Sequence, residues 1–144
     1  MGVALAVVVS ALAFARRHAP GEARVVETTR AARIVRRDGV GLPEKKGVIR
    51  DPARVRALTE ALGIDRLPAA ACPPDYADAD VGIVLSGNDV YARRNVYVFG
   101  LPGLGDAAGG ETRVVSVTSA GCLVGAPADL SALRRELTAA GLLD

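Results

Sequence analysis

Residues 48–63 read Val-Ile-Arg-Asp-Pro-Ala-Arg-Val-Arg-Ala-Leu-Thr-Glu-Ala-Leu-Gly, a short strand that runs directly into a helix. Asp51 suits the N-cap, Pro52 suits the first helical position, and Gly63 suits the left-handed position that ends a helix. From Val55 onward, apolar residues recur at i, i+3 and i+7, which places them on one stripe of the helix. We expect this helix to pack its stripe onto a sheet.

The rest of the chain supplies further strands and a second helix. Residues 67–79 form a loop, because three prolines there forbid a central strand. Between Asp129 and Gly141, leucines at helical spacing predict the second helix. We expect strands within residues 24–38 and at 47–50, 81–85, 90–99 and 113–117. The tight turns of the second half favour antiparallel pairing. The prediction is an α+β domain of order β-β-α-β-β-β-α, whose antiparallel sheet of four to five strands carries two helices on one face.

The first fifteen residues bear on the compartment. Gly2 to Ala15 is an almost wholly apolar run, of the length of a signal-peptide core and short of the ~20 residues of a spanning helix. No basic residue precedes it and Arg16-Arg17 follows it, so a short anchor with a cytoplasmic body and a buried N-terminal element both stay open. We expect residues 1–15 to be a signal peptide or short membrane anchor, 16–23 a linker, and 24–144 a single domain outside the cytoplasm.

Two cysteines, Cys72 and Cys122, lie far apart in the 144-residue sequence. In an extracytoplasmic protein we expect them to form a disulfide, whereas in a reducing cytosol they would be two small buried thiols. Closing so long a loop would stabilise the fold by roughly 4 kcal/mol on the chain-entropy model.

The arrangement of these features is similar to that of small, uncharacterised secreted or lipoprotein-like proteins of high-GC bacteria. The strand that enters a helix through Asp51-Pro52 is followed by Cys72-Pro73 with Asp75, a hairpin, and Gly121-Cys122 before the last helix. Residues 45–140 carry this resemblance, which implies a fold and a compartment and brings no activity or functional residues. The chain lacks the N-terminal lipoprotein cysteine that such proteins often carry.

Positive charge is concentrated in the first part of the chain. Residues 16–56 hold twelve basic and five acidic side chains, and residues 57–144 hold six basic and eleven acidic ones. The densest basic stretch comprises Arg30, Arg33, Arg36, Arg37, Lys45 and Lys46. On a strand, Arg33 and Arg37 would share one face, and Arg30 and Arg36 the other. This stretch predicts contact with an anionic envelope surface or a protein partner; the alternative is an ordinary solvated face. Nucleic acid is disfavoured, because no aromatic residue for base stacking lies between Arg16 and Val55.

Other patterns carry weaker signals for a site. Asp75, Asp78 and Asp80 are weak candidates for a metal site, although no EF-hand spacing is met. Residues 103–108 match a dinucleotide fingerprint, but no helix can open there, so we expect no cofactor. His18, the single histidine, lies in the linker, which leaves no histidine for a nucleophile pair.

Three of the five aromatic residues, Tyr91, Tyr97 and Phe99, fall on one face of a single predicted strand. We expect this face to be buried beneath the helices. The alternative is an exposed aromatic strip that recognises a ligand or partner.

Together these features predict an exported, non-enzymatic binding or interaction module of the cell envelope. Its contact surfaces would be the basic N-terminal strands and the uncovered face of the sheet. The alternative is a small extracytoplasmic hydrolase whose acidic residues meet only in the fold. The sequence identifies neither the ligand nor the oligomeric state.

Overall fold

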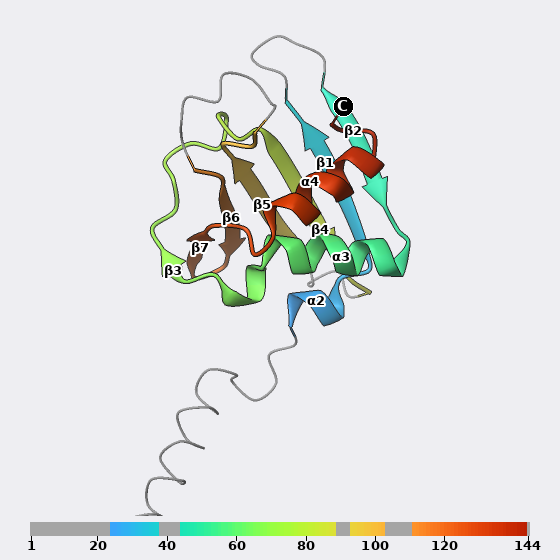
Figure 1. Cartoon of the computed structure of the whole chain (residues 1–144). Coiled ribbons are helices and arrows are strands. Elements are labelled where there is room, and N and C mark those ends of the chain that lie inside the picture. The colour runs from blue at the N-terminus through green and yellow to red at the C-terminus, as the bar shows by residue number, and fades with distance from the viewer. Residues whose placement is uncertain (1–23, 38–43, 89–92, 103–110, 144) are drawn as a thin grey trace, which may run out of the picture.

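A computed structural model describes residues 24–37, 44–88, 93–102 and 111–143. These residues form one antiparallel sheet and the helices that accompany it (Figure 1). The strands lie in the order β2-β1-β4-β5-β6-β7-β3. Their bounds are β1 Ala31–Arg36, β2 Lys45–Ile49, β3 Ala69–Ala70, β4 Val81–Ser86, β5 Arg94–Phe99, β6 Arg113–Thr118 and β7 Gly121–Gly125. The helices are α2 Val25–Thr28, α3 Pro52–Leu62 and α4 Leu130–Ala139, with the 3-10 turn η1 at Ile64–Arg66.

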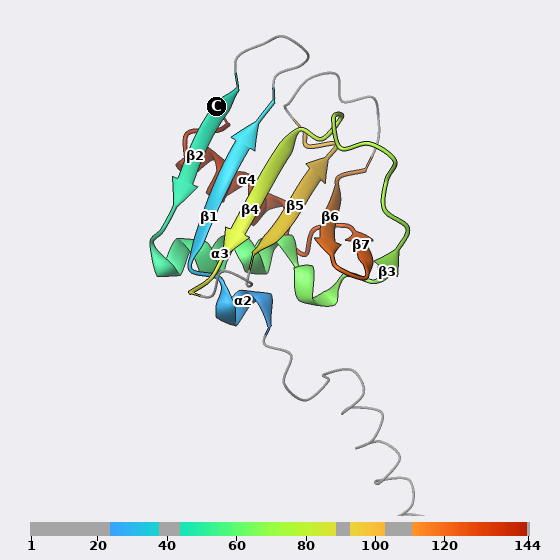
Figure 2. The same cartoon turned by 180° about the vertical axis from the view of Figure 1, so that it is seen from behind.

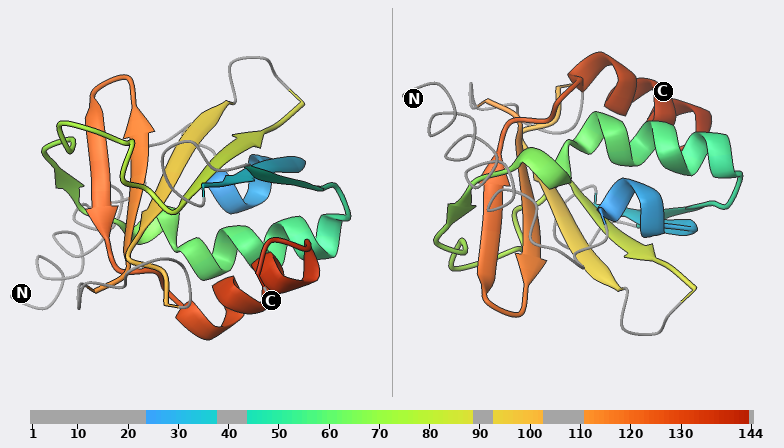
Figure 3. Two further views of the ribbon diagram at one scale, coloured as in Figure 1. Left: turned by 90° about the horizontal axis from the view of Figure 1, so that it is seen from above. Right: turned by 90° about the horizontal axis from the view of Figure 1, so that it is seen from below.

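Helices α3 and α4 lie side by side across one face of the sheet (Figure 3). The view from behind shows the opposite face, where neither of these two helices lies in front of the strands (Figure 2). The core forms between this helix pair and alternate residues of the strands. In β4 and β5, Ile83, Val96 and Val98 are buried with Leu58 of α3 and Leu133 of α4. The sheet is therefore packed on one side and open on the other, a common arrangement for an antiparallel sheet.

Helices α3 and α4 begin and end where the sequence predicts, although the side chain of Asp51 makes no capping hydrogen bond. Helix α3 begins after Asp51, and Gly63 adopts the left-handed conformation with φ of 68° at its C-terminal end. At the second helix, the side chain of Asp129 accepts a hydrogen bond from the backbone N–H of Ala132. Both predicted helices are confirmed.

The predicted number of strands is too low, and one predicted strand is partly a helix. The described residues form seven strands and three α-helices. The additional strands are β7, which holds Cys122, and β3, a two-residue edge strand inside the proline-rich loop. Both depend on partners: Ala69 and Ala70 pair with Leu123 and Cys122. Pairing of so short a segment is a tertiary event, so no periodicity in the sequence announces it.

Helix α2 replaces the first part of the strand expected within residues 24–38. The carboxylate of Asp65 accepts hydrogen bonds from the backbone N–H groups of Val25 and Val26, at 2.9 and 3.3 Å. The hydroxyl of Thr29 donates to the carbonyl of Val25. Asp65 is about forty residues away in sequence, so the local β propensity of this segment was overridden by a contact that only the fold creates.

The described residues contain no helix that combines the length and the apolar character needed to cross a bilayer. The apolar run Gly2–Ala15, the linker 16–23 and the fingerprint at 103–108 lie outside the described residues.

Candidate ligand-binding face of the sheet

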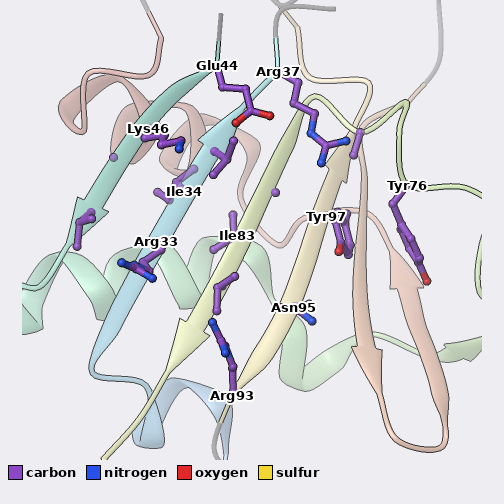
Figure 4. A pocket seen from close by; sticks show the side chains of 16 residues that line it. Arg33, Ile34, Arg37, Glu44, Lys46, Tyr76, Ile83, Arg93, Asn95 and Tyr97 are labelled. Atoms are coloured by element: carbon purple, nitrogen blue, oxygen red, sulfur yellow. The ribbon is translucent and has the colours of Figure 1, made fainter. Parts of the chain in front are cut away.

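A hollow of about 480 Å³ lies on the open face of the sheet. Strands β2, β1, β4 and β5 form its floor, and Tyr76, from the loop before β4, stands at one side (Figure 4). We call it the sheet hollow. Since it lies on the face opposite α3 and α4, neither helix contributes to its lining.

Strand alternation and register arrange its side chains in rows. In one row Val35 stands between Lys46 of β2 and Gly82 of β4, and Gly82 in turn pairs with Tyr97 of β5. In the next row Arg33 stands between Val48 and Val84, and Val84 pairs with Asn95. The small or apolar residues Val35, Gly82 and Val84 thus occupy the middle of the floor.

Because Gly82 has no side chain, the middle of the floor is left unfilled. A Cβ atom built on Gly82 would meet only the ring of Tyr97, at 3.8 and 3.9 Å, which is ordinary van der Waals contact. The position has room for a Cβ atom, and a side chain there would enter the hollow.

Two stacked tyrosines form the wall on the β5 side. The rings of Tyr76 and Tyr97 have centroids 4.4 Å apart and an interplanar angle of 23°. The Tyr76 hydroxyl lies 3.5 Å from Sγ of Cys122, which is bonded to Cys72 in the loop that carries Tyr76. The predicted Cys72–Cys122 disulfide is therefore present, and it ties this loop to β7 beside the hollow.

The expectation that the aromatic residues of this strand face the helices is wrong. Tyr97 lines the sheet hollow, and Phe99, two residues on, lies 5.5 Å from the Arg113 guanidinium. Val96 and Val98 take the buried positions instead. These compact residues fit beneath α3 and α4, whereas Gly82 and Tyr76 give Tyr97 its place on the open side. Tyr91 lies outside the described residues.

Cationic side chains surround the apolar floor. Arg33, Arg37, Lys46 and Arg93 line the hollow, and Glu44 is the single acidic residue among its described lining. Within the part of the chain that the structure describes, the ion pairs are Arg54–Glu136 and Arg56–Glu60, and no hydrogen bond engages these four side chains. Their charge is therefore available to an anion. Arg93 was not singled out from the sequence, because it is distant from the basic stretch and joins it only through the β1–β4–β5 pairing.

The structure divides the predicted basic set between two faces. Arg33, Arg37 and Lys46 reach the sheet hollow, as the alternation of β1 and β2 requires. Arg36 points the other way, and its Nη1 donates to the carbonyl of Leu142 at 2.7 Å. Lys45 is opposite Arg36 in the register, and so on the helix side of β2. Arg30 precedes β1 and donates to the carbonyl of Glu27.

The three aspartates considered for a metal do not converge. Asp75 accepts from the N–H of Ala77 at 2.9 Å, and Asp80 accepts from the N–H of Leu101 at 2.8 Å. Asp78 is exposed. No group of three or more possible metal-ligating side chains occurs among the described residues. Asp75 thus accepts a hydrogen bond from the backbone of its own loop, and Asp80 accepts one from the segment that follows β5.

Comparisons with protein-family models, with curated proteins and with solved structures find no significant match to this chain. The roles of the residues in the sheet hollow therefore rest on geometry and chemistry alone. Chemically, the described lining offers cations, aromatic rings, an amide and valines, with no serine, cysteine or histidine among them. This is a set of groups for binding an anion.

Proposed function

We propose that this protein is an exported, non-enzymatic binding module of the cell envelope that captures an anionic partner on the open face of its sheet. The observation that carries the proposal is the set of four cations around the sheet hollow, which have one acidic neighbour and whose side chains form no ion pair or hydrogen bond within the described part of the chain. A cluster of one sign on an uncovered surface attracts anions over several ångströms. A paired-carboxylate hydrolase centre needs two carboxylates, and the described lining supplies only Glu44.

The envelope location has two supports. The Cys72–Cys122 disulfide is compatible with an oxidising compartment outside the cytoplasm. The apolar run Gly2–Ala15 has the length of a signal-peptide core. The domain would then meet anionic lipid headgroups or acidic polymers.

Binding is tested with vesicles that contain phosphatidylglycerol, compared with neutral phosphatidylcholine vesicles. A basic residue close to an anionic surface contributes about 1 kcal/mol. The double variant Arg33→Gln/Arg37→Gln should therefore weaken binding by about thirtyfold. Binding should also fall steeply with added salt, because exposed charges are screened.

The matched control is Arg134→Gln/Arg135→Gln, which removes the same charge from exposed positions of α4 on the opposite side of the sheet. It should weaken vesicle binding by much less. Equal losses in the two double variants would show that net charge alone drives binding, and absent or salt-insensitive binding would overturn the proposal.

Export is tested by intact mass spectrometry of the protein from its native host, with alkylation before and after reduction. We expect a chain that begins after Ala13 or Ala15 and gains two alkyl groups only after reduction. A chain that retains Gly2 and is alkylated at both cysteines without reduction would place the body in the cytosol, and the envelope role would be abandoned.

A further inference from the structure

We propose that the sheet hollow binds one compact amphipathic anion, whose flat apolar body lies on the floor and whose carboxylate, phosphate or sulfonate meets the arginines at the rim. This inference rests on the proposed function, because it names the chemistry of the anion that the same face captures. It adds a requirement for an apolar body, which capture by charge alone does not have.

The size of the hollow favours a discrete ligand. Its volume of about 480 Å³ falls within the range of roughly 300–1,000 Å³ that small-molecule sites occupy. Tyr76 and Tyr97 close it on one side, and its floor ends at β2, the edge strand of the sheet. A polymer that is held only by charge would need no such aromatic wall.

The floor favours an apolar body. On the solvated face of an antiparallel sheet, outward positions are usually polar. Here Val35, Gly82 and Val84 hold adjacent outward positions. Val48, which lies diagonal to Val35 and opposite Arg33, is 51% exposed, the one exposed large hydrophobic among the described residues. Covering these side chains with a flat apolar group removes their surface from water. The ring of Tyr97 extends the same surface.

The rim supplies the charge and its geometry. Arg33 and Arg37 lie four residues apart on the same face of the chain, with Val35 between them. Lys46 pairs with Val35 across β1 and β2, so three cations flank one apolar position. An arginine fork binds carboxylate or phosphate in a bidentate manner. The ligand thus has its apolar body at the centre and its anionic group at the edge.

The probe is 1-anilinonaphthalene-8-sulfonate, an aromatic sulfonate, compared with the neutral N-phenyl-1-naphthylamine and with inorganic phosphate. We expect the folded protein to bind one equivalent of the sulfonate, and to bind the other two at least about tenfold more weakly, since each lacks one of the two recognised features. Arg33→Gln should weaken binding of the sulfonate by about tenfold, the equivalent of one lost charge-assisted contact. Arg134→Gln, on α4, should leave it unchanged.

The decisive variant is Gly82→Val, which fills the floor without changing any charge. It should weaken sulfonate binding by about tenfold or more. Gly82→Ala, whose Cβ meets only the Tyr97 ring at contact distance, should give a smaller loss and serves if the valine variant does not fold. Circular dichroism melting establishes that each variant is folded.

The outcomes separate this inference from the proposed function. The inference fails if Gly82→Val and Gly82→Ala leave sulfonate binding unchanged, or if the neutral analogue binds as tightly as the sulfonate. In that case the proposed function survives, provided that vesicle binding still depends on Arg33 and Arg37. If Gly82→Val weakens binding of both sulfonate and vesicles, the amphipathic anion is a lipid that enters the hollow. If it weakens only sulfonate binding, the ligand is a free molecule. Loss of arginine-dependent binding to both probes would overturn both proposals.

Discussion

Asp80 connects three segments at the point where β4 begins. Its backbone N–H donates to the carbonyl of Val98, its own carbonyl accepts from Arg37, and Oδ2 of its carboxylate accepts from the N–H of Leu101. These contacts hold together the ends of β1, β4 and β5 at one end of the sheet hollow. The carboxylate is therefore part of the scaffold beside the hollow.

Replacing Asp80 should separate this scaffold role from a metal-binding role. Asp80→Ala leaves the N–H of Leu101 without its acceptor, so we expect a loss of about 1–3 kcal/mol in the free energy of unfolding. Asp80→Asn keeps an acceptor oxygen for this N–H, so it should lower the free energy of unfolding by less. Urea denaturation measures both, with the exposed Asp78→Ala as the control. A melting temperature that rises with Ca²⁺ in the wild type, and not in Asp80→Asn, would contradict the scaffold role.

Single residues also show where sequence reasoning works. The opposite directions of Arg33 and Arg36 follow from strand alternation alone. The face of the sheet on which Tyr97 lies could not be predicted this way, because alternation separates two faces without saying which one the helices cover. That choice depends on Val96 and Val98 packing with α3 and α4, and on Tyr76 arriving from a distant loop.

At the scale of elements, helix α3 ends where the chain passes close to the segment before α4. Gly63 has φ of 68°, and a Cβ atom there would lie 2.8 Å from Cβ of Ala128. The N–H of Asp129, the N-cap of α4, donates to the carbonyl of Ala61 in α3. The end of one helix thus positions the start of the other, and the pair covers the sheet as a unit.

Gly63→Ala should lower the free energy of unfolding by more than an ordinary substitution at a helix end does. The left-handed conformation costs a residue with a Cβ roughly 1–2 kcal/mol, and displacement of Ala128 adds to that. Gly141→Ala is the matched control, since Gly141 has φ of 81° and no atom within 4 Å of its Cβ position. We expect Gly63→Ala to lower the free energy of unfolding by more than Gly141→Ala, measured by urea denaturation. Equal losses would mean that the contact with Ala128 relaxes freely.

At the scale of the whole molecule, the disulfide joins the loop before β4 to β7 near one edge of the sheet. Cys72 and Cys122 are 50 residues apart, and β4, β5 and β6 lie between them in the chain. The bond therefore restricts most of the sheet in the unfolded chain while it holds Tyr76 beside Tyr97 in the folded one.

The double variant Cys72→Ala/Cys122→Ala should lower the free energy of unfolding by about 4 kcal/mol on the chain-entropy model. It should also diminish the near-ultraviolet circular dichroism of the tyrosines, because Tyr76 loses its anchor; the chain contains no tryptophan to obscure that signal. Tyr76→Leu, which keeps the disulfide, is the control for the optical change. A double variant as stable as the wild type would show that the loop is held by its other contacts.

The sequence by itself determined the α+β class, the antiparallel pairing, both long helices with their ends, and the faces of Arg33 and Arg37. Each of these depends on interactions within a few residues: helix caps, helical spacing, tight turns and strand alternation. Only the tertiary structure decided that α2 is a helix, that β3 and β7 extend the sheet, and that Arg93, Gly82 and Tyr97 join the basic strand around one hollow. The physical reason is that these outcomes depend on partners far away in the chain, such as Asp65 for α2 and Tyr76 for Tyr97.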